Sequence, residues 1–109
     1  MAVAEEAYRL TARLPKEEVF GMTSQIRRAA VSIAANIAEG YGRDNSGSFI
    51  QFLRMSQGSL KELETHLLLS ARVGLVPTAD REPLLGRCDE LGRMLRSLIR
   101  SIQRKRSSE

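Results

Sequence analysis

Arginine recurs every three or four residues near the C-terminal end of this chain. The interval from position 87 to 106 holds seven cations: Arg87, Arg93, Arg96, Arg100, Arg104, Lys105 and Arg106. Only Asp89 and Glu90 oppose them there. A guanidinium group is a planar fork of donors that binds two oxygens of a phosphate or carboxylate at once. The spacing predicts a line of such groups down one helix, and we take the seven residues as candidate nucleic-acid-binding residues.

The composition leaves three interpretations of this line open. The chain of 109 residues has 17 Lys and Arg against 13 Asp and Glu, with a pI of about 9.8. This excess of basic residues is compatible with binding to nucleic acid, with binding to an acidic partner protein, or with a solvated face whose cations complement the helix dipole. With two Tyr, three Phe and no Trp, few rings are present for base stacking. We therefore expect contact with RNA or DNA to involve the backbone or shape.

A second set of polar residues lies between residues 24 and 42, in an expected helix. Its apolar stripe consists of Ile26, Ala30, Ile33 and Ile37. Arg28, Asn36 and Glu39 lie beside that stripe. We hypothesise that these three form a structural polar network that specifies how helices meet, with Arg28 pairing with Glu39 of a neighbouring chain or with polar groups near Asn36. Ordinary four-helix packing is the simpler alternative.

The residues that could carry catalysis or hold a metal are isolated. His66 is the only histidine, and it follows Glu62 by four residues, which predicts an intrahelical pair. Cys88 is the only cysteine, and its place on an apolar stripe predicts a buried side chain. We find no glycine-rich phosphate loop, nucleophile elbow or paired-carboxylate motif. We therefore expect no enzyme activity, no metal site and no cofactor.

The sequence also predicts a cytoplasmic protein that does not enter a membrane. A single cysteine cannot form an intramolecular disulfide, which fits a reducing compartment. No segment is apolar over the length of a membrane span, and the N-terminus lacks the basic-then-apolar pattern of a signal peptide.

Hydrophobic periodicity predicts four helices and no strand, hence an all-α, antiparallel, up-down-up-down four-helix bundle. The expected helices cover about residues 3–13, the acidic run after Lys16 to residue 39 or 41, residues 44–46 to about 73, and 80–106. Gly74 is expected to end the third helix. Either Thr78 or Asp80 can cap the fourth, and Asp80 is preferred because this leaves Pro83 in the first turn. Residues 1–106 would form one domain, with 107–109 as a frayed tail.

Two features of the later helices predict close contacts. The third helix has an apolar seam made of Phe49, Leu53, Ser56, Leu60, Leu63, Leu67 and Ser70. Gly58 interrupts this helix, and we infer that it admits a close crossing with the alanine-rich second helix. The fourth helix has a seam of Leu84, Cys88, Leu91, Leu95, Leu98 and Ile102, widened by Leu85, Met94 and Ile99. So wide a stripe predicts a homo-oligomer, because one bundle cannot cover all of it.

Several motifs in register resemble one protein family. They are LPKEE (14–18), QIRRAAVSIAANIAEG (25–40) followed by Tyr41–Arg43, and SFIQFLRMSQGSLKELETHL (48–67). The chain resembles the small four-helix bundle proteins encoded in intervening sequences of bacterial 23S ribosomal RNA genes, from about Tyr8 to Leu75. That family is related to accessory proteins of diversity-generating retroelements. The resemblance implies a non-catalytic protein that forms a pentameric ring and binds nucleic acid beside a reverse transcriptase.

Overall fold

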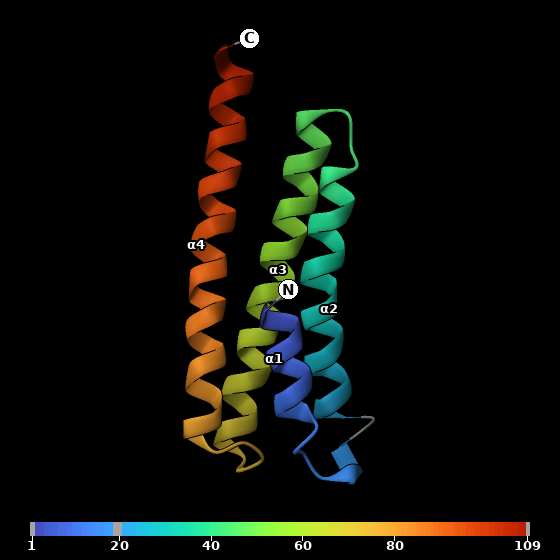
Figure 1. Ribbon diagram of the computed structural model, residues 1–109, viewed down its shortest axis with the longest axis vertical. Coiled ribbons are helices and arrows are strands. Elements are labelled where there is room, and N and C mark those ends of the chain that lie inside the picture. The colour runs from blue at the N-terminus through green and yellow to red at the C-terminus, as the bar shows by residue number, and fades with distance from the viewer. Residues whose placement is uncertain (1, 19–20, 109) are drawn as a thin grey trace.

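The computed structural model describes residues 2–18 and 21–108, and all regular structure within those ranges is helical (Figure 1). The helices are α1 (Ala2–Thr11), a single 3₁₀ turn (Lys16–Glu18), α2 (Met22–Tyr41), α3 (Ser46–Arg72) and α4 (Thr78–Ser108). Successive helices run in opposite directions along a molecule of 52 × 22 × 18 Å. The predicted all-α, antiparallel four-helix bundle is confirmed.

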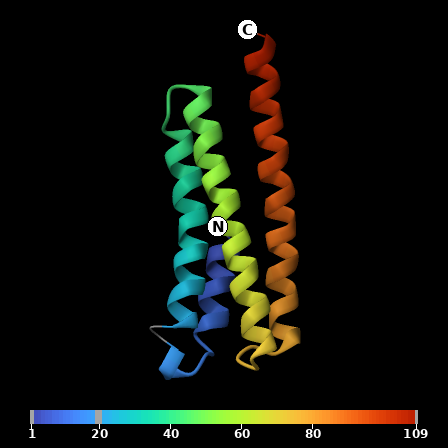
Figure 2. The same cartoon turned by 180° about the vertical axis from the view of Figure 1, so that it is seen from behind.

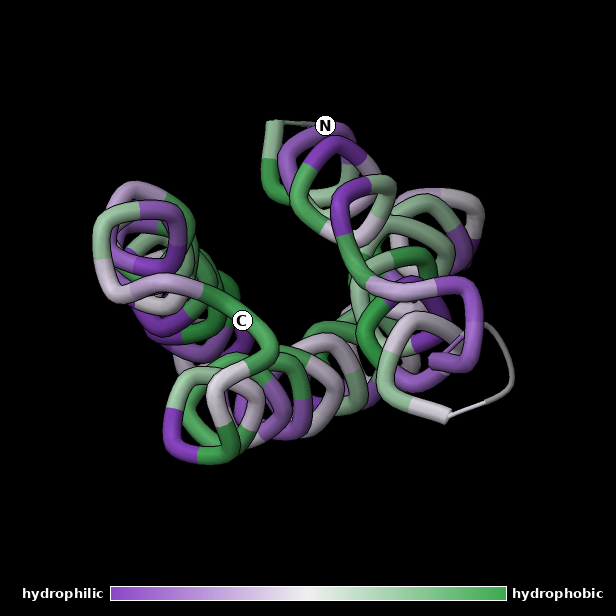
Figure 3. The backbone as a smooth tube through the Cα atoms, turned by 90° about the horizontal axis from the view of Figure 1, so that it is seen from below, coloured by the Kyte–Doolittle hydropathy of each residue, from purple (hydrophilic) through white to green (hydrophobic). Residues whose placement is uncertain are grey.

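The helices surround a common centre when viewed along the long axis (Figure 3). Helix α3 packs between α2 and α4, and α1 closes the circle by packing on α2 and α4. All four helices contribute buried apolar residues, including Ala7 of α1, Ile33 of α2, Leu63 of α3 and Cys88 of α4. These side chains form one continuous core, which accounts for most of the fold's stability.

Helix α1 is much shorter than the others, and this shapes the bundle. Its 10 residues span about 15 Å, whereas the 31 residues of α4 span about 46 Å at 1.5 Å per residue. The N-terminus consequently lies about midway along the bundle, and only three helices form the half beyond it (Figure 1, Figure 2). Arg27 of α2 holds α1 in place, because its Nε donates to Thr11 Oγ1 at 2.8 Å and its guanidinium lies 4.7 Å from the Tyr8 ring centroid.

The α2–α3 hairpin has well-defined ends. Asn45 caps α3, with its side-chain oxygen accepting a hydrogen bond from the Ser48 N–H at 2.8 Å. At the other end of α3, Gly74 has a φ of +82°, and the Leu75 N–H donates to the Ser70 carbonyl at 2.9 Å. This is the glycine-terminated ending that the sequence predicts. The buried residue in the first turns of α3 is Ile50, whereas Phe49 of the predicted seam is only partly buried.

Helix α4 begins and ends outside its predicted limits. It starts at Thr78, and the Pro77 carbonyl accepts from the backbone N–H groups of Asp80 and Arg81 at 3.0 and 3.2 Å. The predicted cap by Asp80 is therefore wrong, since the Asp80 carboxylate instead pairs with Arg13 at 3.1 Å and ties α4 to the loop after α1. The helix continues to Ser108, beyond the expected end at residue 106.

The predicted close crossing at Gly58 is also wrong. A Cβ built on Gly58 would have no neighbour within 4 Å, because this glycine lies on the exposed side of α3. The close approach of α2 and α3 occurs instead at Gly40, where a Cβ would lie 2.9 Å from Phe49 Cδ1 and 3.3 Å from Phe52 Cβ. Gly40 is thus where two aromatic residues of α3 pack against α2.

We expect Gly40→Ala and Gly58→Ala to change stability in opposite directions. At Gly40 the added methyl group forces Phe49 and Phe52 to move, which destabilises the fold by about 1–3 kcal/mol. At Gly58 it meets open space and improves helix propensity, which stabilises by about 0.5–1 kcal/mol. Thermal and urea denaturation followed by circular dichroism measures both changes. Equal melting temperatures for the two variants would contradict this packing.

Candidate nucleic-acid interface

All seven predicted cations of α4 have exposed side chains, but they do not form one line. Helix α4 faces the core with Leu84, Cys88, Leu95 and Ile99. Arg93, Arg96, Arg100 and Arg104 lie on the side of α4 turned away from this seam or beside it, as the helical period requires. Arg87 points elsewhere, toward α1, where its Nε forms an ion pair with Glu6. Arg87 therefore joins α1 to α4.

Other members of the predicted set have local partners. Arg93 pairs with Asp89, one turn before it on α4. Arg106 extends to the first turn of α3, where its Nη2 lies 3.4 Å from the place that a Cβ on Gly47 would occupy. The C-terminal turns of α4 therefore lie beside the N-terminal turns of α3.

Charge is strongly segregated along the bundle. Gly92 is level with Leu60, and Ser32 is level with Ser59, so residues 32–60 and 92–108 form one half, which we call the basic end. Its eight cations are Arg43, Arg54, Arg93, Arg96, Arg100, Arg104, Lys105 and Arg106, and its two carboxylates are Glu39 and Asp44. The remaining described residues hold nine cations and ten carboxylates. The described residues of the two halves thus carry formal charges of +6 and −1.

Two residues of this surface, Arg43 and Arg54, were missed in the sequence analysis. The signal for Arg54 was an absence of acidic residues: positions 46–60 and 91–108 contain no Asp or Glu, although they lie far apart in the chain. The antiparallel packing of α3 and α4 brings these two acid-free stretches together. Arg54 is exposed, whereas Arg43 lies over the Phe52 ring at 4.8 Å and pairs with Glu39 at 3.0 Å.

The predicted polar network of Arg28, Asn36 and Glu39 is not assembled within this chain. Asn36 Nδ2 donates to the Ser32 carbonyl at 2.9 Å and lies 3.1 Å from Ser32 Oγ, which is itself 2.7 Å from Ser59 Oγ. Asn36 thus supports the α2–α3 contact. Glu39 pairs with Arg43, and Arg28 is exposed and forms no ion pair within the described part of the chain. Pairing of Arg28 with Glu39 of a neighbouring chain stays a prediction.

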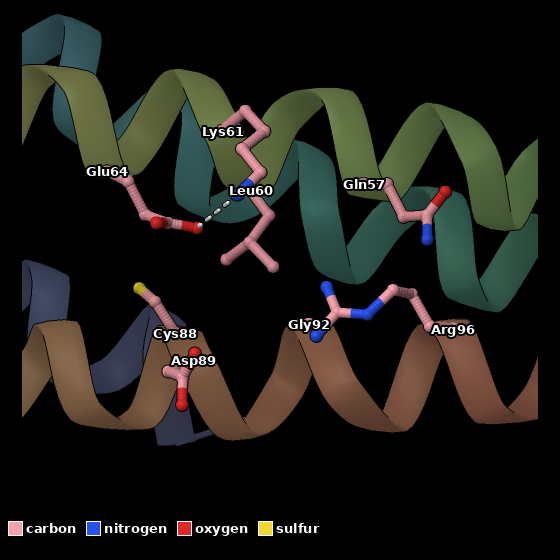
Figure 4. Close-up of a pocket in the computed structure, with 8 residues that line it drawn as sticks. All are labelled: Gln57, Leu60, Lys61, Glu64, Cys88, Asp89, Gly92 and Arg96. Atoms are coloured by element: carbon pink, nitrogen blue, oxygen red, sulfur yellow. Dashed lines mark ion pairs between the residues drawn. The ribbon is translucent and has the colours of Figure 1, made fainter.

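A cavity of about 290 Å³ opens between α3 and α4 beside Cys88 (Figure 4). Arg96 and Gln57 line one end of it, and Glu64 lies near the thiol at the other end. Burial, together with the negative charges of Glu64 and Glu6, raises the pKa of the Cys88 thiol to about 12. The thiol is therefore protonated at neutral pH and is a poor nucleophile. Its role is that of a small core residue, as predicted from the sequence.

The remaining chemical candidates have structural explanations. His66 Nε2 lies 3.4 Å from Glu62 Oε1, which is the predicted intrahelical pair. Among residues 2–18 and 21–108, no group of three or more His, Cys, Asp or Glu is arranged to hold a metal ion. No helix in those ranges is both long and apolar enough to cross a membrane.

An apolar groove of about 530 Å³ runs between α2 and α4, beyond the point where α1 begins. Its lining consists of Ile37, Tyr41, Leu91, Met94, Leu95, Ser97, Leu98 and Ser101. Tyr41 and Met94 are each 66% exposed, which is unusual for large apolar side chains. The predicted excess of apolar surface on α4 is therefore real, although Ile99, expected outside the seam, is buried in the core.

The chain is similar to known proteins in fold and in sequence. A crystal structure of a protein of unknown function from the S23 ribosomal protein family of Bacteroides thetaiotaomicron VPI-5482 superimposes with a TM-score of 0.73 and 25% sequence identity. The match covers 89% of this chain and 97% of that one. No curated protein matches the chain. The family model described as "23S rRNA-intervening sequence protein" matches residues 1–97, and the chain belongs to that family.

Proposed function

We propose that this protein is a non-catalytic, self-associating bundle that binds the backbone of RNA or DNA through its basic end. The observation that supports the proposal most directly is the charge segregation, +6 against −1 for the two halves of one small molecule. Stability does not require this arrangement, since exposed ion pairs contribute little and like charges on one surface repel. A polyanion removes the repulsion, and counterion release from its phosphates provides the driving force.

Self-association is the second part of the proposal, and the apolar groove between α2 and α4 supports it. The groove lies where a fourth helix of full length would pack, and α1 is too short to fill it. Covering Tyr41, Met94 and their neighbours with a second copy removes apolar surface from water. We propose a closed ring, with the pentamer that the family resemblance implies as the favoured number. A role beside a reverse transcriptase rests on the same resemblance.

The alternative is a protein-interaction module that docks an acidic partner protein and does not bind nucleic acid. The exposed guanidinium groups of Arg96 and Arg100 suit carboxylates as well as phosphates. Measuring the affinity for nucleic acid across a salt series, and testing whether an acidic protein co-purifies, separates the two functions.

Replacing Arg93, Arg96, Arg100 and Arg104 together with Gln should abolish most nucleic-acid binding and leave the fold intact. Each lost phosphate contact reduces the slope of log affinity against log salt by about 0.9 on duplex and about 0.7 on single strands, per subunit engaged. The measurement is fluorescence anisotropy with labelled oligonucleotides across a salt series.

A matched control removes the same charge from the opposite end, by replacing Arg9, Lys16, Arg28 and Arg72 with Gln. The control should retain most of the wild-type salt slope. Equal loss in both variants would mean that net charge alone drives binding. If the wild type binds no nucleic acid at low salt, the protein-interaction function takes over, and an acidic protein that co-purifies only with the wild type supports it.

Met94→Glu should weaken self-association and leave the single bundle folded, because Met94 is 66% exposed within one chain. A carboxylate buried in an interface without a partner is strongly unfavourable. Sedimentation velocity at tens of micromolar should show an oligomer for the wild type and a smaller species for the variant. Met55→Glu, at a residue 49% exposed on α3 and outside the groove, is the control. A monomeric wild type would exclude the ring.

A further inference from the structure

We infer that the basic end binds a double-stranded nucleic acid across one groove, with Arg54 of α3 on one side and the row of arginines on α4 on the other. Arg54 is the cation that α3 contributes at this end, and Arg96 and Arg100 belong to the α4 row. This inference rests on the proposed function and specifies its substrate class and one further binding residue.

The register of α3 and α4 places Arg54 beside the α4 row. Gly92 and Leu60 mark one level, since a Cβ on Gly92 would lie 3.4 Å from Leu60 Cδ2. One turn further toward the basic end, Gln57 of α3 and Arg96 of α4 line opposite sides of the same cavity (Figure 4). A further turn on each helix leads from Gln57 to Arg54 and from Arg96 to Arg100. Arg54 and Arg100 therefore lie on the same face of the bundle.

The electrostatic surroundings of Arg54 leave it available for a ligand. Its side chain is exposed, and it forms no ion pair with any described residue. The other cations on this side of α3 are Lys61, which lies 3.9 Å from Glu64, and Arg72, and both belong to the opposite end. The nearest stretches of α3 and α4 carry no carboxylate that could neutralise Arg54.

The separation of Arg54 from the α4 row favours a duplex over a single strand. Packed helices have axes about 8–10 Å apart, which lies between the widths of the minor groove (about 6 Å) and major groove (about 12 Å) of B-DNA. Long arginine side chains can adjust to either width. A duplex presents phosphates on both sides of a groove, whereas a single strand presents one backbone. Single-strand binders also use exposed aromatic platforms. In the basic end, Phe52 lies under Arg43 and Phe49 packs on Tyr41 with ring centroids 4.9 Å apart. Tyr41 is exposed, but it lines the apolar groove between α2 and α4 and not the α3–α4 face.

Arg54→Gln and Arg72→Gln form a matched pair that tests this inference. Arg72 is also exposed on α3, and it lies 18 residues after Arg54, which is about five helical turns and hence the same side of the helix. Only Arg54 is in the basic end. Binding is measured by anisotropy across a salt series with a mixed-sequence DNA duplex, the corresponding RNA duplex, and one DNA strand of equal length.

Arg54→Gln should reduce the salt slope on at least one duplex by about 0.9 per subunit engaged and leave the single-strand slope unchanged. Arg72→Gln should change neither slope, and both variants should melt like the wild type. The inference is overturned if Arg54→Gln behaves like Arg72→Gln, or if it lowers the single-strand slope as much as the duplex slope. A wild type that binds none of the three probes rejects the proposed function itself, which is a different result from loss of duplex preference.

Discussion

The close contact between α2 and α3 is the interaction on which the rest of the bundle depends. Gly40 allows Phe49 and Phe52 to pack against α2, and the Ser56 hydroxyl donates to the Ile33 carbonyl at 3.0 Å inside the interface. Small and hydroxyl side chains let two backbones approach without leaving polar groups unpaired. The hairpin so formed offers one side to α1 and the other to α4, and the level of every residue in α4 follows from its packing on α3.

Two surfaces of different chemistry result from that arrangement. The groove between α2 and α4 is apolar because α1 ends its coverage midway along the bundle, whereas the α3–α4 face is basic because two acid-free stretches meet there. Helix α4 contributes to both, with Met94 in the groove and Arg100 on the basic face. Self-association through the groove would therefore leave the cations of the other face accessible.

The fold could be predicted in detail wherever local chemistry determines it. Hydrophobic periodicity identified the helices, the turn at residues 44–46 and Gly74 marked the ends of α3, and Cys88 was recognised as a core residue. Failures arose where a long-range contact decided the outcome. Asp80 is used in a pair with Arg13, and Gly40 rather than Gly58 is the site of close approach. The α4 arginines were apparent from their spacing, but Arg54 could be recognised as a candidate only from the register of α3 and α4, which brings it beside residues that lie more than 40 positions later in the chain.

The uneven charge along the bundle gives each molecule, which is 52 Å long, an electric dipole along its long axis. A polyanion would orient such a molecule before contact and draw its basic end forward, which raises the rate of productive encounter. In an assembly with parallel subunits, the positive poles would lie side by side and oppose the apolar attraction. A bound polyanion would relieve that opposition, and by thermodynamic linkage the assembled form would bind the polyanion more tightly. The short first helix and the segregated charge would together make assembly of the subunits and binding of the polyanion favour each other.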